Sequence, residues 1–174
     1  AHPLVSKHVE TRQSRTWRMA TATIDGVLAF LIEQAPDAPV WPRSEPLAPS
    51  AVAGLDHAVI RTPAPERALA TYGARLGLDL RLDRTAEEWG TRFLFFRLGD
   101  LTLEIVHALN EGVSAGPDKA WGLTWRTPDL DAAHARIAAA NFNVSEIRAG
   151  RKPGTRVFTV RDGTCGVPTL MIGT

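Results

Sequence analysis

The sequence predicts an α+β fold made of two tandem βαβββ units, and three observations support this prediction. Residues 60–80 resemble residues 125–145, each segment carries one helical stripe of apolar residues, and short strand-like stretches follow each stripe. The spacing between matching residues stays at 64 or 65 over nearly forty residues. Because chance rarely keeps such a register, we interpret the two segments as copies of one supersecondary unit.

Each copy begins with a strand, is interrupted by proline and continues as a helix. Residues 54–61 (GLDHAVIR) alternate enough to predict the first strand. Apolar stripes predict helices near 65–76 and 129–140. Gly77 and Asn141 follow these helices, where a left-handed residue is favoured. Further strands are expected near 78–83, 91–98 and 101–107, and again near 142–148, 155–161 and 167–173.

The chain divides into three parts at a proline-rich stretch. Residues 1–34 form an N-terminal segment with an expected β-hairpin over 15–33, turning at the favoured hairpin dipeptide Asp25-Gly26. Residues 35–53 read as an extended linker, because five prolines fall between positions 35 and 50. The main domain covers 54–174, with units 54–109 and 120–174.

The N-terminal segment also resembles the end of the main domain. Residues 15–34 match residues 154–174 as the last hairpin of a unit that lacks its front end. We therefore expect the chain to be the C-terminal part of a longer tandem protein.

Composition and charge exclude several classes of protein. The formal net charge of +1 in 174 residues gives no electrostatic argument for nucleic acid or an anionic membrane. No apolar run approaches the roughly 20 residues that a membrane-spanning helix needs. The single cysteine, Cys165, excludes an intrachain disulfide and a cysteine-rich zinc site. A cytoplasmic location is the simplest expectation.

The first unit opens with the pattern LDHAVIRTPAPERALATYGARLG (55–77), which resembles the vicinal oxygen chelate superfamily. This superfamily includes glyoxalases, bleomycin-resistance proteins, epimerases and extradiol dioxygenases, and the resemblance covers residues 54–173. It implies a curved, cup-like mixed sheet with helices on the outside and a small-molecule ligand in the cup. It is also compatible with a homodimer.

The resemblance implies a divalent metal in the cup, either zinc, nickel, manganese or iron. His57 and Glu104 match the ligand positions of the first unit, and Glu104 would be the catalytic residue. In the second unit the matching positions are Gly122 and either Leu170 or Met171, which supply no ligand. We therefore expect a weakly held metal and consider an extradiol dioxygenase unlikely, because that chemistry needs ligands in the later unit.

Strand parity suggests substrate-binding residues, because alternate residues share one face of a sheet. Arg61 lies on the face of His57, and Arg126 on the face of Gly122. Two converging guanidinium groups would suit a carboxylate or a phosphate. The favoured alternative is that each arginine sits at a strand end and pairs with a surface carboxylate. The remaining candidates for substrate binding are Thr124 and Trp121.

The sequence leaves three functions open and does not decide whether the protein is an enzyme. The first is a metal-dependent lyase or isomerase acting at His57 and Glu104. The second is a metal-free protein that sequesters a ligand in an apolar cleft, as bleomycin-resistance proteins do. The third is a non-catalytic unit within a larger tandem protein.

Overall fold

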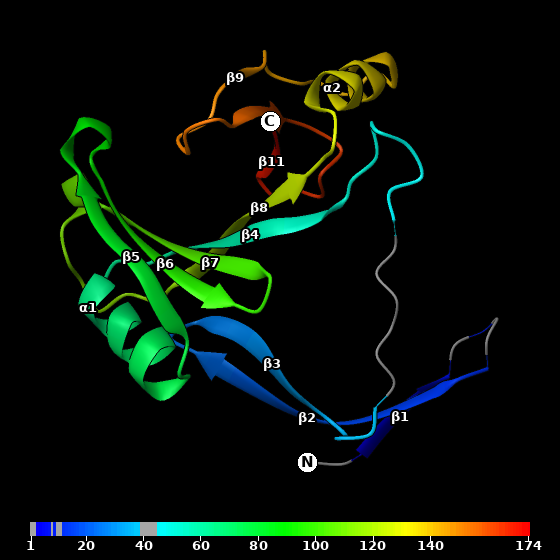
Figure 1. Cartoon of the computed structure of the whole chain (residues 1–174). Coiled ribbons are helices and arrows are strands. Elements are labelled where there is room, and N and C mark those ends of the chain that lie inside the picture. Colours follow the sequence, from blue (N-terminus) through cyan, green and yellow to red (C-terminus); the bar gives the residue numbers. More distant parts are fainter. Residues whose placement is uncertain (1–2, 8, 10–11, 39–44) are drawn as a thin grey trace. The chain divides into compact units, whose positions relative to one another are not determined.

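A computed structural model describes residues 3–7, 9, 12–38 and 45–174 in two compact units, Ala1–Arg43 and Ser44–Thr174 (Figure 1). Residues 39–44 of the expected 35–53 linker lie outside the described residues. The helices of the described residues are too short or too polar to span a bilayer.

The N-terminal unit is an antiparallel sheet of three described strands, ordered β1-β2-β3. Its strands are β1 (Pro3–Lys7), β2 (Ser14–Ile24) and β3 (Val27–Gln34). The hairpin turn lies at Asp25 and Gly26, whose φ angles are 48° and 103°. Two consecutive positive φ angles match the twist of the flanking strands, which is the property that makes Asp-Gly a favoured turn.

The second unit holds an eight-stranded mixed sheet with the order β5-β6-β7-β4-β8-β11-β10-β9. Helix α1 (Pro65–Ala68) continues as a π-helical segment, η1 (Leu69–Arg75), and the second helix is α2 (Leu130–Ala139). Short 3₁₀ turns occupy η2 (Glu87–Trp89) and η3 (Leu109–Glu111). The strands are β4 (Gly54–Arg61), β5 (Asp79–Ala86), β6 (Thr91–Leu98), β7 (Leu101–Ala108), β8 (Lys119–Arg126), β9 (Arg148–Ala149), β10 (Arg156–Val160) and β11 (Thr169–Gly173).

The two central strands, β4 and β8, pair in a register that repeats the internal symmetry of the sequence. Leu55 pairs with Trp125, and Ile60 pairs with Ala120. A spacing of 65 residues converts the first pair into the second. A local twofold axis therefore passes beside the pair Ala58–Leu123 and relates the two halves of the sheet.

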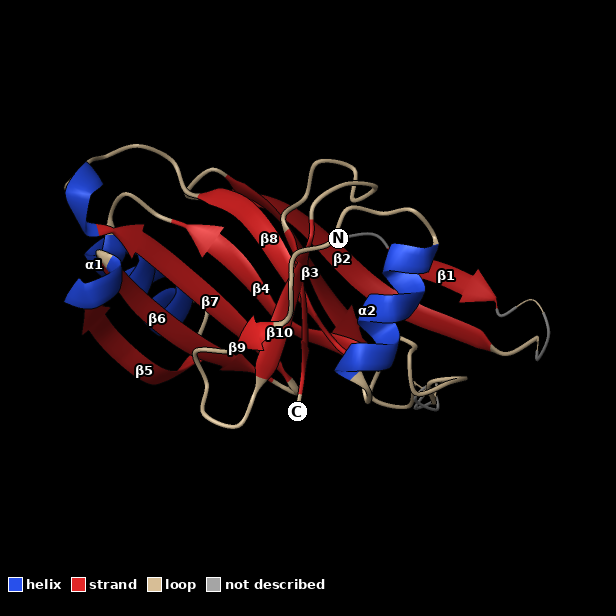
Figure 2. Ribbon diagram, turned by 90° about the horizontal axis from the view of Figure 1, so that it is seen from above, coloured by secondary structure: helices blue, strands red, loops and turns tan. Residues whose placement is uncertain are grey.

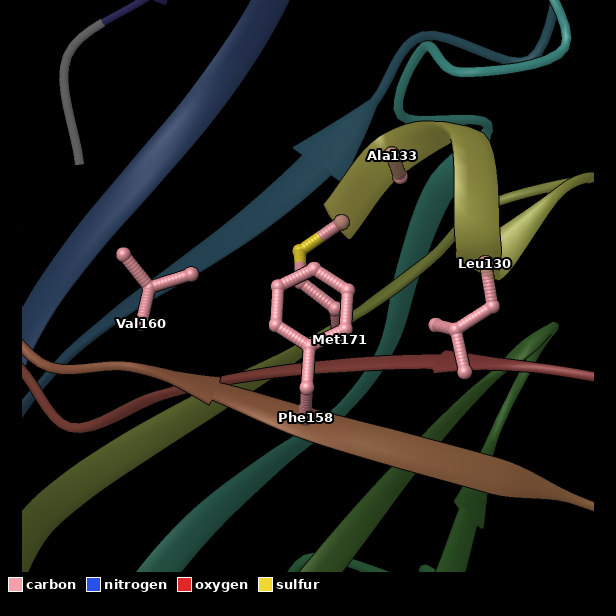
Figure 3. Close-up of a cluster of buried hydrophobic side chains, with 5 residues drawn as sticks. All are labelled: Leu130, Ala133, Phe158, Val160 and Met171. Carbon is pink, nitrogen blue, oxygen red and sulfur yellow. The ribbon is translucent and has the colours of Figure 1, made fainter. Parts of the chain in front are cut away.

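The helices pack on one face of this sheet and confirm the predicted α+β class. Helix α1 contacts β7, η1 contacts β6, and α2 contacts β10 and β11 (Figure 2). Beneath α2 lies a cluster of buried apolar side chains, drawn in Figure 3, which consists of Leu130, Ala133, Phe158, Val160 and Met171.

One predicted strand is largely missing from the structure. Of residues 142–148, only a bridge from Val144 to Val160 and the first residue of β9 are strand. The reason is that side chains replace ladder bonds, because Asn143 N donates to Asp162 Oδ1 at 2.9 Å and Thr159 N donates to Ser145 Oγ at 2.9 Å. The predicted helix caps are confirmed, with φ of 69° at Gly77 and 64° at Asn141.

Packing in this cluster predicts a large effect of truncating Phe158. This side chain is fully buried and also meets the His134 ring edge-on, with a centroid separation of 4.9 Å. We expect Phe158→Ala to lower the free energy of unfolding by about 3–5 kcal/mol, as measured by denaturant titration. Leu98→Ala, at a half-exposed strand end, is the control and should cost less than about 1 kcal/mol. Equal losses in the two variants would contradict this assignment of the core.

Candidate functional site

A cavity of about 520 Å³ lies against the second sheet and is lined from both of its halves. Strands β4, β6 and β7 supply one wall, and β8, β10 and β11 supply the other. A volume of this size suits a small organic molecule. Much of the lining is apolar, from Val59, Phe93, Phe95, Val106, Val157, Leu170 and Ile172.

Two bulges in the central pairing turn extra side chains toward this cavity. The register between β4 and β8 shifts at Asp56 and again at Trp121, two residues that are 65 positions apart. A bulge lets consecutive residues reach the same face, which regular alternation forbids. Asp56 therefore lines the cavity together with His57, and Trp121 lines it together with Gly122.

The polar centre of the cavity is a histidine held between two carboxylates. His57 Nδ1 lies 2.9 Å from Asp56 Oδ2, and His57 Nε2 lies 3.1 Å from Glu104 Oε2. The side chains of His57 and Glu104 are 17% and 12% exposed. The structure thus brings together the two residues that the sequence proposed as metal ligands, and it adds Asp56.

This arrangement favours the protonated imidazole. Burial lowers the pKa of His57, but the hydrogen bonds to Asp56 and Glu104 outweigh it and raise the pKa from 6.5 to about 9. The hydrogen bond from His57 in turn lowers the pKa of Asp56. At neutral pH the imidazolium donates one N–H to each carboxylate, so the three groups form a charge-assisted chain.

The opposite wall does not complete a metal site. Gly122 has no side chain, and a Cβ placed there would lie 2.9 Å from the carbonyl oxygen of Pro168. The register identifies the other missing ligand, because Val59 pairs with Glu104 in the first half and Thr124 pairs with Leu170 in the second. Leu170, and not the core residue Met171, is therefore the counterpart of Glu104.

The donor set available to a metal is correspondingly small. Asp56 and Glu104 contact opposite nitrogens of one imidazole ring, so these three groups cannot all ligate a single ion. Among the described residues, no cluster of three or more histidine, cysteine, aspartate or glutamate side chains could hold a metal. The residues present therefore do not fit a metal centre formed by this chain alone.

The remaining candidates from the sequence divide into two groups. Trp121 and Thr124 line the cavity. Arg61 does not, and its guanidinium pairs with Glu111 at 2.7 Å. Arg126 also lies outside the lining, with Nη1 3.8 Å from Asp56 Oδ1. Both arginines sit at strand ends, beyond the last residues that face the cavity.

Sequence reasoning missed Asp56 and three cations, Arg148, Arg151 and Lys152, which all line the cavity. Strand parity assigns Asp56 to the face opposite His57, and only the bulge reverses this. The cations lie on the β9–β10 hairpin, in the segment RAGRKPGT (148–155). Arg151 and Lys152 lie between Gly150 and Gly154, and Arg148 lies two residues before Gly150. This clustering of cations in the sequence was a signal, but nothing in the sequence shows which way the hairpin folds.

The charged chain predicts how stability depends on pH. A pKa that rises from 6.5 to about 9 on folding stabilises the protein fully below about pH 6.5, and this contribution is lost as the pH rises through about 9. At about 1.4 kcal/mol per pKa unit, the free energy of unfolding should fall by up to roughly 3 kcal/mol between pH 6.5 and 10. His57→Gln, measured by denaturant titration at each pH, should remove this part of the decline. Parallel pH profiles for the two proteins would rule out the charged chain.

Comparisons with known proteins agree with this architecture. The crystal structure of methylmalonyl-CoA epimerase from Mycobacterium tuberculosis is 22% identical, with a TM-score of 0.60, and the match covers 72% of this chain and 91% of that one. A variant methylmalonyl-CoA epimerase from Streptomyces coelicolor, in complex with 2-nitronate-propionyl-CoA, is also 22% identical, with a TM-score of 0.59 and coverage of 70% and 94%. At these identities the likeness shows the fold.

A hypothetical protein from Bacillus halodurans has the same fold at 17% identity, with a TM-score of 0.59 and coverage of 69% of this chain and 93% of that one. No curated protein matches the chain. The model of the glyoxalase/bleomycin resistance protein/dioxygenase superfamily matches residues 56–159, which is more than half of the chain. The chain therefore belongs to this superfamily.

Proposed function

We propose that residues 44–174 bind a small organic molecule in the cavity, and that binding requires no metal held by this chain. The observation that carries this proposal is the wall opposite His57 and Glu104. It presents Gly122, Pro168 and Leu170, which offer no carboxylate, imidazole or thiol. The apolar lining supplies a hydrophobic contribution to binding, and the Asp56–His57–Glu104 chain supplies polar groups that orient the ligand.

The structure suggests what the polar chain would do for such a ligand. Its groups are already hydrogen-bonded to one another, because His57 contacts both carboxylates. A bound molecule then meets a preorganised hydrogen-bonding edge, so little ordering is required when it binds. In this role His57 and Glu104 bind the ligand and take no part in a chemical reaction.

Ligand titration with and without metal tests this proposal. Three probes are added to EDTA-treated protein: benzyl alcohol, phenylacetate and benzylamine. We expect at least one of them to shift the backbone amide NMR signals of cavity residues such as Thr124 and Thr159. Adding Zn²⁺ or Mn²⁺ should change the affinity by less than about twofold. Leu170→Trp, which fills the cavity, should abolish the shifts, whereas Leu98→Trp at an exposed strand end should preserve them. Binding that appears only after metal is added would overturn the proposal.

A second candidate is a metal-dependent isomerase or lyase with Glu104 as the catalytic residue. It is favoured by the placement of His57 and Glu104 on one cavity wall, and by structural neighbours described as methylmalonyl-CoA epimerases. In this case His57 would hold a divalent ion whose coordination is completed by groups from outside this chain, and the ion would supply Lewis-acid chemistry at a substrate carbonyl. Glu104 would accept the proton from the adjacent carbon.

Isotope exchange tests this candidate directly. An epimerase should catalyse uptake of deuterium at the α-carbon of methylmalonyl-CoA in D₂O when Zn²⁺, Ni²⁺, Mn²⁺ or Fe²⁺ is supplied, as followed by mass spectrometry. Glu104→Gln should slow this uptake by at least about a hundredfold, because it removes the proton acceptor. Uptake at the uncatalysed rate with every metal would exclude the epimerase reaction.

A further inference from the structure

We propose that the ligand of this cavity is an organic anion whose carboxylate or phosphate group binds the cations of the β9–β10 hairpin. This inference rests on the proposed binding function and specifies its ligand class. Arg148, Arg151 and Lys152 all line the cavity from one hairpin. Three cations that face one cavity favour a ligand with negative charge.

The hairpin holds these cations in place through its backbone. Gly150 N donates to Thr155 O at 2.8 Å, and Thr155 N donates to Lys152 O at 3.1 Å. The Thr155 hydroxyl donates to Lys152 O at 2.6 Å as well. A Cβ on Gly150 would lie 2.3 Å from Thr155 Oγ1, so the close approach of the two arms requires glycine. The turn is therefore compact, and less conformational entropy is lost when it binds an anion.

Arg151 is held further by aromatic rings. Its guanidinium carbon lies 4.5 Å from the ring centroid of Trp89 and 5.0 Å from that of Phe93, which is itself part of the cavity wall. A guanidinium packed on an aromatic ring keeps its in-plane N–H groups available for hydrogen bonds. This geometry suits the paired oxygens of a carboxylate or a phosphate.

The carboxylates of the cavity form no ion pair with these cations among the described residues, although the charge of Lys152 helps to lower the pKa of Asp56. Within the described residues, none of the ion pairs involves Arg148, Arg151 or Lys152. Asp56 and Glu104 also line the cavity, and both are hydrogen-bonded to His57. Cationic groups thus outnumber the carboxylates around the cavity, and a ligand with negative charge would balance them.

The apolar lining of the cavity favours a ligand that also has an apolar part. The lining also includes Val59, Phe95 and Leu170, and Trp121 lines the cavity with 48% of its surface exposed. An inorganic anion would leave these surfaces in contact with water. The preferred ligand therefore combines an apolar or aromatic body with one acidic group at its end.

Four probes with similar bodies separate charge from apolar contact in isothermal titration calorimetry with the full chain. Phenyl phosphate and phenylacetate should bind about tenfold more tightly than benzyl alcohol, and benzylamine should bind most weakly. Raising the NaCl concentration from about 0.05 M to 0.5 M should weaken the binding of the two anions and leave the binding of benzyl alcohol unchanged. Inorganic phosphate that binds as tightly as phenyl phosphate would indicate an adventitious ion only and would overturn the proposed ligand class.

Matched variants test the assignment to the hairpin. The double variant with Arg148→Ala and Lys152→Ala should bind phenyl phosphate about fivefold to tenfold more weakly than the unaltered protein, as expected for the loss of two exposed charge contacts. The control is the double variant with Arg75→Ala and Arg161→Ala, which removes the same charge at two exposed positions outside the cavity lining. Its affinity for phenyl phosphate should stay within about twofold of that of the unaltered protein.

The binding of benzyl alcohol distinguishes a failure of the proposed anion site from a failure of the proposed binding function. Unchanged benzyl alcohol binding in the hairpin variant shows that its cavity is intact, so an unchanged affinity for phenyl phosphate would then refute the anion site alone. Equal weakening in both variants would also refute it, because only net charge would matter. Failure of all four probes to bind the unaltered protein would contradict the proposed binding function itself.

Discussion

The register between β4 and β8 is the constraint on which the rest of the larger unit depends. The antiparallel pairing joins two copies of the same βαβββ unit about a local twofold axis. The symmetric bulges at Asp56 and Trp121 belong to this register, and they let neighbouring residues on each strand reach the same face. A slip by one residue would turn His57 and Gly122 away from the cavity and expose core residues in their place. The site and the core are therefore fixed by one set of backbone hydrogen bonds.

Symmetry of the backbone contrasts with asymmetry of the side chains that face the cavity. In the first half, His57 and Glu104 come within hydrogen-bonding distance, and Asp56 binds the other ring nitrogen. In the second half, the carbonyl oxygen of Pro168 occupies the space where a side chain at position 122 would begin. This oxygen also accepts a hydrogen bond from the backbone N–H of Leu123 at 2.9 Å, so it is held in place. The absence of a ligand there is thus built into the packing of β8 against β11.

The sequence predicted most of the fold because its periodic signals are strong and occur twice. The α+β class, both helix caps and the pair His57–Glu104 followed from the repeat or from the family pattern. Two kinds of feature did not follow. The expected strand over 142–148 is broken where the Asp162 and Ser145 side chains accept hydrogen bonds from the backbone N–H groups of Asn143 and Thr159, and this geometry depends on residues distant in the sequence. Asp56 was not a candidate from the sequence, because strand parity places it on the face opposite His57, and parity holds only where a strand has no bulge.

The same half of the sheet that lacks metal ligands brings the cationic hairpin to the cavity. A divalent ion would place positive charge beside His57 and Glu104, whereas the protonated imidazole and the Arg148, Arg151 and Lys152 side chains supply such charge without an ion. A site with a bound ion and a site with only cationic side chains interact with a ligand in different ways. An ion binds ligand oxygens directly and polarises them, whereas guanidinium and ammonium groups hold an acidic group through hydrogen bonds and charge. We therefore propose recognition rather than metal-dependent catalysis as the role of the side chains that this chain places around its cavity.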